Sequence, residues 1–204
     1  MNNIEKAFET NSTAKGFADQ YLTYLSKVLA QLDREEISKV IGTFQEARKN
    51  DSQILFIGNG GSAATASHFA NDLGVGLRNW KKPFRALALT DNVAAITALA
   101  NDHGYDHIFV RQLQIVMRPG DVVVAISASG NSKNIVDAVE YANTNGGKTI
   151  GFTGFTGGKL RSMAHQSIHV PTLAGEYGPV EDVHMILDHL ISAFLMMVSR
   201  KEPT

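Results

Sequence analysis

The sequence predicts an α/β fold in which helices cover both faces of a parallel sheet. Five short apolar runs, each rich in β-branched or aromatic residues, alternate with stretches that have helical spacing. Strand, turn and helix repeated in this order are typical of a doubly wound parallel sheet. The length of 204 residues and the hydrophobic content of 44% are enough for one domain with a sizeable core.

Two helices are expected before the first strand. Apolar residues recur mostly at steps of three and four from Ile4 to about Leu32, as in an amphipathic helix, and a second helix is expected over residues 34–48. We interpret residues 1–50 as a helical arm for oligomerisation. Residues 51–204 would then form the α/β core of the same single domain, 1–204.

The alternating region supplies the expected sheet and most of the helices. Strands are expected at 53–58, 84–89, 121–127, 148–153 and 166–171, and helices at 62–77, 93–99, 107–117, 133–144 and 159–164. A long helix from about Val180 to Ser199 ends the series, and its apolar second half indicates burial within or between subunits. Ligands of an open parallel sheet bind beyond the carboxyl ends of the strands, so functional residues are expected just after Gly58, Leu89, Ile126 and Thr153.

The composition excludes several classes of partner. The formal charge is −1, from 19 basic and 20 acidic residues without a basic run, which disfavours nucleic acid. No uninterrupted apolar stretch approaches the ~20 residues that span a bilayer, and no secretion signal begins the sequence, so we expect no membrane partner and a cytoplasmic location. Because there are no cysteines, histidine and carboxylate groups must hold any metal.

The first expected strand ends in GNGGS, residues 58–62. Its glycines would let the backbone approach a polar ligand, and the following helix offers free amides and a positive dipole end. The motif lacks the last glycine of the dinucleotide fingerprint. The alternative is a tight turn in which Ser62 only caps the helix.

The third expected strand ends in SASGNS, residues 127–132. The hydroxyls of Ser127, Ser129 and Ser132, with Gly130 to relax the turn, would form a small cup for a phosphate at a helix start. No lysine accompanies the cup, so a phosphomonoester is favoured over a nucleoside triphosphate. The alternative of helix-capping serines accounts for one or two of the three hydroxyls.

Groups that could bind a metal or transfer a proton occur on two expected helices. His68 and Asp72 are four residues apart and share one side of their helix, either as ligands of a divalent ion or as a surface pair. The last helix offers a larger set, and spacing leaves open which of its members point inward: Glu181, Asp182, His184, Asp188 and His189. In the polar segment at 98–106, Asp102 could hold substrate hydroxyls or simply make turn hydrogen bonds.

Taken together, these segments resemble the sugar isomerase (SIS) domain and, within it, the sedoheptulose 7-phosphate isomerases, also called phosphoheptose isomerases. The likeness covers almost the whole chain: GNGGS, SHFANDL, ALTDN, ALANDHGYD, SASGNS, GFTG and DVHMILDH. It implies a three-layer α/β/α sandwich around a five-stranded parallel sheet of flavodoxin-like type. It also implies a homotetramer with sites at subunit contacts, and a role in heptose biosynthesis for lipopolysaccharide or capsule.

The resemblance also implies roles for individual residues. Substrate oxygens would be held around the two loops and by the last helix: Asn59, Gly60, Gly61, Ser62, Asp102, Ser127, Ala128, Ser129, Ser132 and Glu181. The positions that match the family's zinc ligands are His68, Asp72, Glu181 and His189. Aspartate replaces the family's glutamate at 72 and glutamate replaces glutamine at 181, while Gly76 and Gly178 stand where an arginine and an aspartate are expected. The preferred sugar could therefore differ.

The expected reaction converts a ketose phosphate into an aldose phosphate through an enediol. It needs a base near carbon, an acid near oxygen and a group that stabilises the developing oxyanion. We assign Asp72 and His189 as the acid/base pair. We expect a divalent ion to polarise the carbonyl, with Zn²⁺ as the favoured ion. Two rival functions remain: a non-catalytic relative that binds the bacterial replication initiator, and a phosphosugar sensor, although no DNA-binding domain is visible.

Overall fold

The sheet has five parallel strands in the order β2-β1-β3-β4-β5, in a computed structural model that describes residues 1–201. The strands are β1 (Gln53–Gly58), β2 (Arg85–Ala88), β3 (Val122–Ser127), β4 (Lys148–Thr153) and β5 (Gln166–His169). All four neighbouring pairs are parallel, and their register aligns Gly58 with Ile126 and Ser127 with Thr153. The polar loops after β1, β3 and β4 therefore leave the same edge of the sheet.

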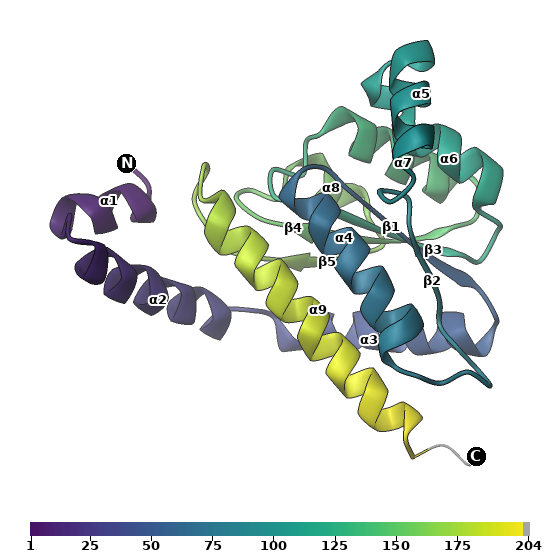
Figure 1. The fold of residues 1–204 in the computed structure, drawn as a ribbon, viewed down its shortest axis with the longest axis horizontal. Helices are drawn as coiled ribbons and strands as arrows, with labels where there is room; N and C mark the ends of the chain where they lie inside the picture. The colour runs from purple at the N-terminus through teal and green to yellow at the C-terminus, as the bar shows by residue number, and fades with distance from the viewer. Residues whose placement is uncertain (202–204) are drawn as a thin grey trace.

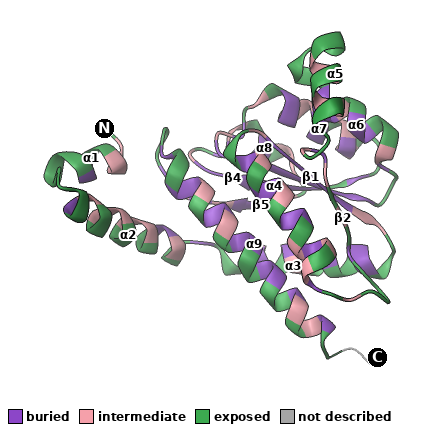
Figure 2. Cartoon of the chain, viewed as in Figure 1, coloured by how far each residue is buried: buried purple, intermediate pink, exposed green. Residues whose placement is uncertain are grey.

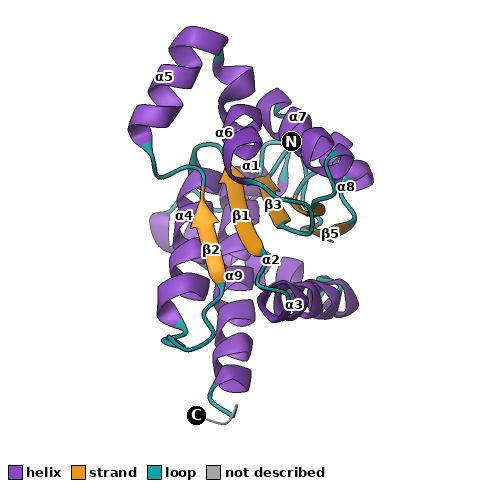
Figure 3. Ribbon diagram, turned by 90° about the vertical axis from the view of Figure 1, so that its right-hand side faces the viewer, coloured by secondary structure: helices purple, strands orange, loops and turns teal. Residues whose placement is uncertain are grey.

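Helices cover both faces of this sheet and complete three layers (Figures 1 and 3). One face carries α3 (Arg34–Lys49), α4 (Gly61–Asn71) and α9 (Tyr177–Ser199), and the other carries α6 (Ile108–Val116), α7 (Lys133–Thr144) and α8 (Gly158–Met163). Both faces need a helical cover because successive side chains of β1 point to opposite sides of the sheet and are apolar on both. Ile54 and Phe56 enter the first layer of side chains, whereas Leu55 and Ile57 enter the second.

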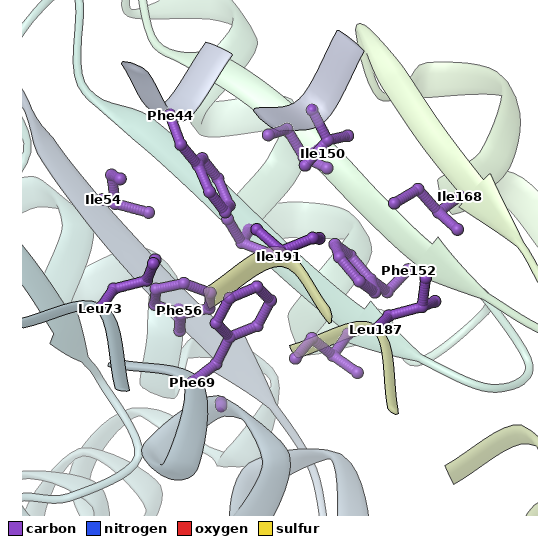
Figure 4. Close-up of a cluster of buried hydrophobic side chains, with 14 of the residues drawn as sticks. Phe44, Ile54, Phe56, Phe69, Leu73, Ile150, Phe152, Ile168, Leu187 and Ile191 are labelled. Carbon is purple, nitrogen blue, oxygen red and sulfur yellow. The ribbon is translucent and has the colours of Figure 1, made fainter. Parts of the chain in front are cut away.

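Aromatic side chains fill the first layer beneath α9. Phe56 of the sheet packs against Phe69 of α4 with ring centroids 4.8 Å apart, and Phe44 of α3 meets both rings edge to face. Figure 4 shows Leu187 and Ile191 of α9 closing over this group. By length and composition α9 could cross a bilayer, but a core helix passes the same test. Its buried row here lies in the core.

The N-terminal region differs from the single helix expected over residues 4–32. It forms two helices, α1 (Asn3–Thr10) and α2 (Ala14–Ala30), because Asn11 ends the first and the side chain of Thr13 caps the second by accepting from Gly16 N. Both helices extend away from the sheet and are largely exposed (Figures 1 and 2). By contrast, α3 belongs to the sandwich and buries Val40 and Phe44.

Two other segments differ from expectation near the ligand edge. The helix expected over 93–99 continues to His103 as α5, which starts at the side-chain cap of Asn92 and is followed by a short 3-10 turn, Tyr105–His107. The helix expected over 62–77 ends as α4 at Asn71, and a π-helical turn continues from Asp72 to Gly76. Single π-helical turns are frequent at functional sites.

Candidate active site

A small pocket lies where the loops after β1 and β3 meet the start of α9. Its volume is about 120 Å³ and its walls are Asn59, Ser62, Ile126, Ser127, Ala128, Ser129, Ser132, Tyr177 and Glu181. We call the four serines of this set the serine cup: Ser62, Ser127, Ser129 and Ser132. Within residues 1–201 no lysine or arginine lines the pocket, so hydroxyls and backbone amides supply its attraction for an anion.

The local backbone leaves two of these hydroxyls free of helix capping. Gly60, not Ser62, is the N-cap of α4, and its φ of +55° is a conformation that glycine adopts at little cost. Ser132 is the N-cap of α7, but its side chain makes no capping hydrogen bond. The alternative that these serines merely cap helices is therefore not supported. Both helix N-termini direct amides and a positive dipole end toward the pocket region.

The other two serines are held by the loop itself. The hydroxyl oxygen of Ser127 accepts from Gly130 N at 3.2 Å, and that of Ser129 accepts from Asn131 N at 3.3 Å. A hydroxyl that accepts in this way still has its own proton to donate. The cup can therefore offer O–H donors to phosphate oxygens.

Asn59 is fixed by side chains from two other elements. It forms a reciprocal amide pair with Asn134 of α7, at 2.8 and 2.9 Å, and its Oδ1 also accepts from the hydroxyl of Tyr105 at 2.8 Å. These contacts orient the amide at the pocket wall. They also join the segment after α5 to the pocket through one side-chain contact.

A second group of polar side chains lies farther along α4 and α9. Potential ligand atoms of His68, Asp72, Asp188 and His189 all lie within 4.8 Å of one another. We call these four residues the histidine–aspartate cluster. The Nε2 atoms of His68 and His189 are 3.1 Å apart, and Nε2 of His68 is 3.5 Å from Oδ2 of Asp72 and 4.0 Å from Oδ2 of Asp188.

Asp188 is the buried member of the cluster. Its side chain is 0% exposed, its Oδ1 accepts from the hydroxyl of Ser192 at 3.1 Å, and its Oδ2 has no hydrogen-bond partner within residues 1–201. Burial first, and then the charge of Asp72, raise the pKa of Asp188 to about 7. A carboxylate in such a position needs a cation, a proton or a donor group nearby.

The pocket and the cluster are joined by the contact line between α4 and α9, which we call the α4–α9 seam. Gly61 lies beneath the carboxyl group of Glu181, since a Cβ at this position would come within 2.3 Å of Oε2. Two turns farther along both helices, His68 meets His189. The helices therefore run side by side in the same direction (Figure 1), with the pocket at their start and the cluster farther on.

Glu181 and Asp182 diverge at the start of α9. Burial, followed by the charge of Asp182, raises the pKa of Glu181, which lies at the pocket wall. Asp182 turns away and accepts from the hydroxyl of Tyr21 on α2 at 2.5 Å. Of the two neighbouring acids, only Glu181 borders the pocket.

Comparison with known proteins identifies the family of this chain. Residues 16–154 match the model of the SIS domain. The chain belongs to the SIS domain family. This SIS domain is 38% identical over 161 residues to the phosphoheptose isomerase of Aquifex aeolicus, covering 79% of this chain and 83% of the relative. It is 39% identical over 179 residues to that of Akkermansia muciniphila, covering 86% and 89%.

A solved relative has the same fold. The structure of a phosphoheptose isomerase from Neisseria gonorrhoeae superimposes with a TM-score of 0.80 at 30% identity, covering 90% of this chain and 98% of the other. The five-stranded parallel sheet and its two helical layers are therefore those of the SIS fold, as the sequence predicted.

The SIS fold brings most of the predicted site residues into two places. Seven of them line the pocket, Gly60 and Gly61 form the adjoining turn, and the cluster collects His68, Asp72 and His189. Glu181 lies at the pocket and not in the cluster. Asp102 does not line the pocket; it is exposed on α5, where its Oδ1 accepts from the amide of Asn101 at 2.8 Å.

Sequence reasoning did not assign four residues that the structure places at the site. Tyr177 lines the pocket, Tyr105 and Asn134 hold Asn59, and Asp188 completes the cluster. Asp188 was among five candidates on the last helix, and its separation of two turns from Glu181 was a usable signal for a shared face. The two tyrosines come from separate segments, so no local pattern indicated them.

Proposed function

We propose that this protein interconverts a ketose phosphate and an aldose phosphate, with sedoheptulose 7-phosphate and a heptose 7-phosphate as the favoured pair. One observation carries the proposal: the serine cup and the histidine–aspartate cluster lie along one seam. Glu181 of the pocket and Asp188 of the cluster are two turns apart, which is about 10 Å at ~1.5 Å rise per residue. A sugar phosphate of about seven carbons has its phosphate and its reacting carbons at opposite ends of a comparable chain. The names of the relatives support the same substrate.

The serine cup would bind the phosphate. Its O–H donors and the N-termini of α4 and α7 provide neutral donors and positive dipole ends, and these suit an anion that must be released after each turnover. Asn59 and Glu181 border the same pocket and would hold hydroxyls of the sugar. Asp102 remains a proposed hydroxyl ligand, which in this chain would have to act from α5 of a neighbouring subunit or after a movement of α5.

The histidine–aspartate cluster fits a divalent cation. Imidazole nitrogens and carboxylate oxygens are the donor types that zinc accepts, and two nitrogens facing each other at 3.1 Å can share one ion. His68, Asp72 and His189 would hold it. When bound, such an ion would polarise the substrate carbonyl and stabilise the negative charge that develops on its oxygen. Zn²⁺ is the proposed ion.

The same residues would move the protons. An enediol pathway removes a proton from one carbon and returns it to the next, while a second proton passes between the oxygens. We assign Asp72 and His189 as the acid/base pair, because the two groups lie within the cluster on different helices and can approach the reacting carbons from two sides. Glu181 at the pocket wall would keep a hydroxyl oriented during the transfer.

The decisive experiment measures conversion of sedoheptulose 7-phosphate by the purified, metal-loaded protein. Asp72→Ala and His189→Ala should each lower kcat by about 10² to 10⁴ if they transfer protons directly. Asp51→Asn is the matched control, since this exposed carboxylate precedes β1 at the opposite edge of the sheet. Full activity of either site variant would remove its catalytic assignment.

The same assay separates the rival functions. A wild-type protein that binds the sugar phosphate without converting it would be a sensor. One that shows no affinity for any ketose phosphate of five to seven carbons, but binds the replication initiator, would be a non-catalytic relative. Either result overturns the isomerase proposal.

We also propose that the protein assembles with further copies of itself, and we favour a homotetramer. An apolar row on α9 faces outward: Ile186, Leu190, Phe194 and Met197. Phe8 and Leu22 of the N-terminal arm are also exposed. Apolar surface of this kind is typical of contacts between subunits. A cytoplasmic location stays a prediction.

A further inference from the structure

We propose that Asp188 is the fourth protein ligand of the divalent cation, with His68, Asp72 and His189, and that Glu181 does not bind the ion. The inference rests on the proposed function, because the cation is the one that the isomerase would use. It changes the ligand set expected from the sequence, in which Glu181 had the fourth place.

The first argument is geometric. The four donor atoms lie within 4.8 Å of one another, whereas donors in a tetrahedral zinc site with bonds of ~2.0–2.2 Å are about 3.4 Å apart. The Nε2 atoms of His68 and His189 already have nearly this separation, at 3.1 Å, and Asp72 follows at 3.5 Å from His68. Oδ2 of Asp188, at 4.0 Å from the same nitrogen, requires a shift of less than about 1 Å.

The second argument is the state of the Asp188 side chain. Ser192 donates to Oδ1 and so fixes the plane of the carboxylate. Oδ2 points toward His68 and has no hydrogen-bond partner in the described part of the chain, although the residue is fully buried. One oxygen oriented by a neighbour and the other left for an ion is the usual arrangement of a metal-binding carboxylate. A residue with only a packing role would have no need of a charge at this place.

The third argument excludes Glu181. Its carboxylate lies over Gly61 at the start of the α4–α9 seam, two helical turns before Asp188. None of its oxygens belongs to the group of ligand atoms that lie within 4.8 Å of one another in residues 1–201. Glu181 is therefore on the same face as Asp188 but beside the pocket, where it can contact the sugar and not the ion.

Charge agrees with this assignment. Two carboxylates from Asp72 and Asp188 would neutralise a divalent cation, two neutral imidazoles would add no charge, and the substrate oxygen would join as a fifth donor. The four ligands come from α4, the first residue of its π-helical turn, and α9. One chain therefore supplies all of them.

The test measures metal affinity directly and compares Asp188→Asn with Glu181→Gln. Metal-free protein is titrated with Zn²⁺ by isothermal calorimetry against a competing chelator, and bound Co²⁺ is monitored by its visible absorption. We expect Asp188→Asn to weaken Zn²⁺ binding by more than 100-fold and to change the Co²⁺ spectrum. Glu181→Gln should keep both within about threefold. Ser192→Ala, which removes only the orienting donor, should cost about 10-fold.

Thermal unfolding separates a ligand from a structural residue. Without metal, Asp188→Asn should unfold at the wild-type temperature or above it, because the change removes an unpaired buried charge. Added Zn²⁺ should raise the melting temperature of the wild type much more than that of Asp188→Asn. Asp188→Ser serves as a second variant. If both variants unfold at clearly lower temperature than the metal-free wild type, Asp188 is structural and the proposal is wrong.

Other outcomes also decide the question. Wild-type affinity in Asp188→Asn, loss of binding in Glu181→Gln, or a wild type that binds no divalent cation would each overturn the proposal. Metal affinity that depends on Asp188 in a protein without isomerase activity would leave the ligand assignment standing and remove the proposed function. An active enzyme whose metal affinity does not depend on Asp188 would support the proposed function and overturn the ligand assignment.

Discussion

His184 is a fully buried titratable residue on the inner side of α9. Its ring packs edge to face on Phe152, with centroids 5.8 Å apart, and both ring nitrogens are buried. Burial lowers the pKa of His184 to about 4; the Thr153 backbone opposes this change, and the charge of His169 adds to it. The neutral ring is therefore the form that the folded protein accepts.

This predicts an acid-sensitive contribution to stability. Because the folded pKa is lower than the ordinary value of 6.5, the unfolded chain binds more protons between about pH 6.5 and 4, and stability falls as the pH is lowered through that range. The loss should be on the order of 3 kcal/mol, at 1.36 kcal/mol per pKa unit. In His184→Leu, urea unfolding of metal-free protein from pH 7.5 to 4.5 should lack this loss. Parallel pH profiles of the wild type and the variant would contradict the assignment.

At the scale of elements, the SASGNS loop is braced by the loop after β4 and by α8. Gly154 N donates to Ala128 O and Leu160 N donates to Gly130 O, both at 2.9 Å. Gly130 has φ of +65°, and a Cβ there would lie 1.9 Å from the carbonyl oxygen of Gly157. The shape of the serine cup therefore depends on a close approach of two backbones that no side chain permits.

Gly130→Ala should damage the cup and the fold together. The left-handed conformation alone costs about 1 kcal/mol or more, and the collision with Gly157 adds to this. We expect a lower melting temperature and a KM for the phosphorylated sugar raised by more than 10-fold. Gly42→Ala is the matched control. This glycine lies inside α3 with nothing within 4 Å of the new Cβ, so it should stabilise by about 0.5–1 kcal/mol. An unchanged KM in Gly130→Ala would show that the loop does not form the phosphate site.

At the scale of the whole molecule, α9 has two apolar sides, one buried and one exposed. Val183, Leu187, Ile191 and Leu195 lie in the core, while the outward row, Ile186, Leu190, Phe194 and Met197, is exposed in the single chain. The arm formed by α1 and α2 extends away from the sheet and leaves much of its own surface uncovered (Figure 2). Both surfaces are candidates for the proposed contacts between copies of this chain.

Phe194→Glu should therefore weaken self-association. Burying a charge in an apolar contact is costly, so sedimentation velocity should show the wild type as a multimer and this variant shifted to smaller species. Ile115→Glu, a change of the same kind at an exposed residue of α6 on the other helical layer, should keep the wild-type distribution. A monomeric wild type would remove the proposed assembly.

The sequence by itself determined the order of strands and helices and the two glycine and serine turns. β1 and β4 have the bounds expected from their apolar runs, as does α7 from its helical spacing. This success has a local cause, because a strand or helix pattern depends on residues close together in the chain. The break at Asn11 is also a local signal, carried by a cap that the apolar spacing concealed.

Only the tertiary structure decided which side chains meet. Spacing along α9 shows that Glu181 and Asp188 share a face, but the alignment of α4 with α9 sends the first toward the pocket and the second toward His68. Likewise, no local sequence pattern shows whether Asp102 lies in a binding site or on an exposed helix. The physical reason is that periodicity fixes direction about one helix axis, whereas coordination depends on the relative position of two axes, which the packing of the core sets.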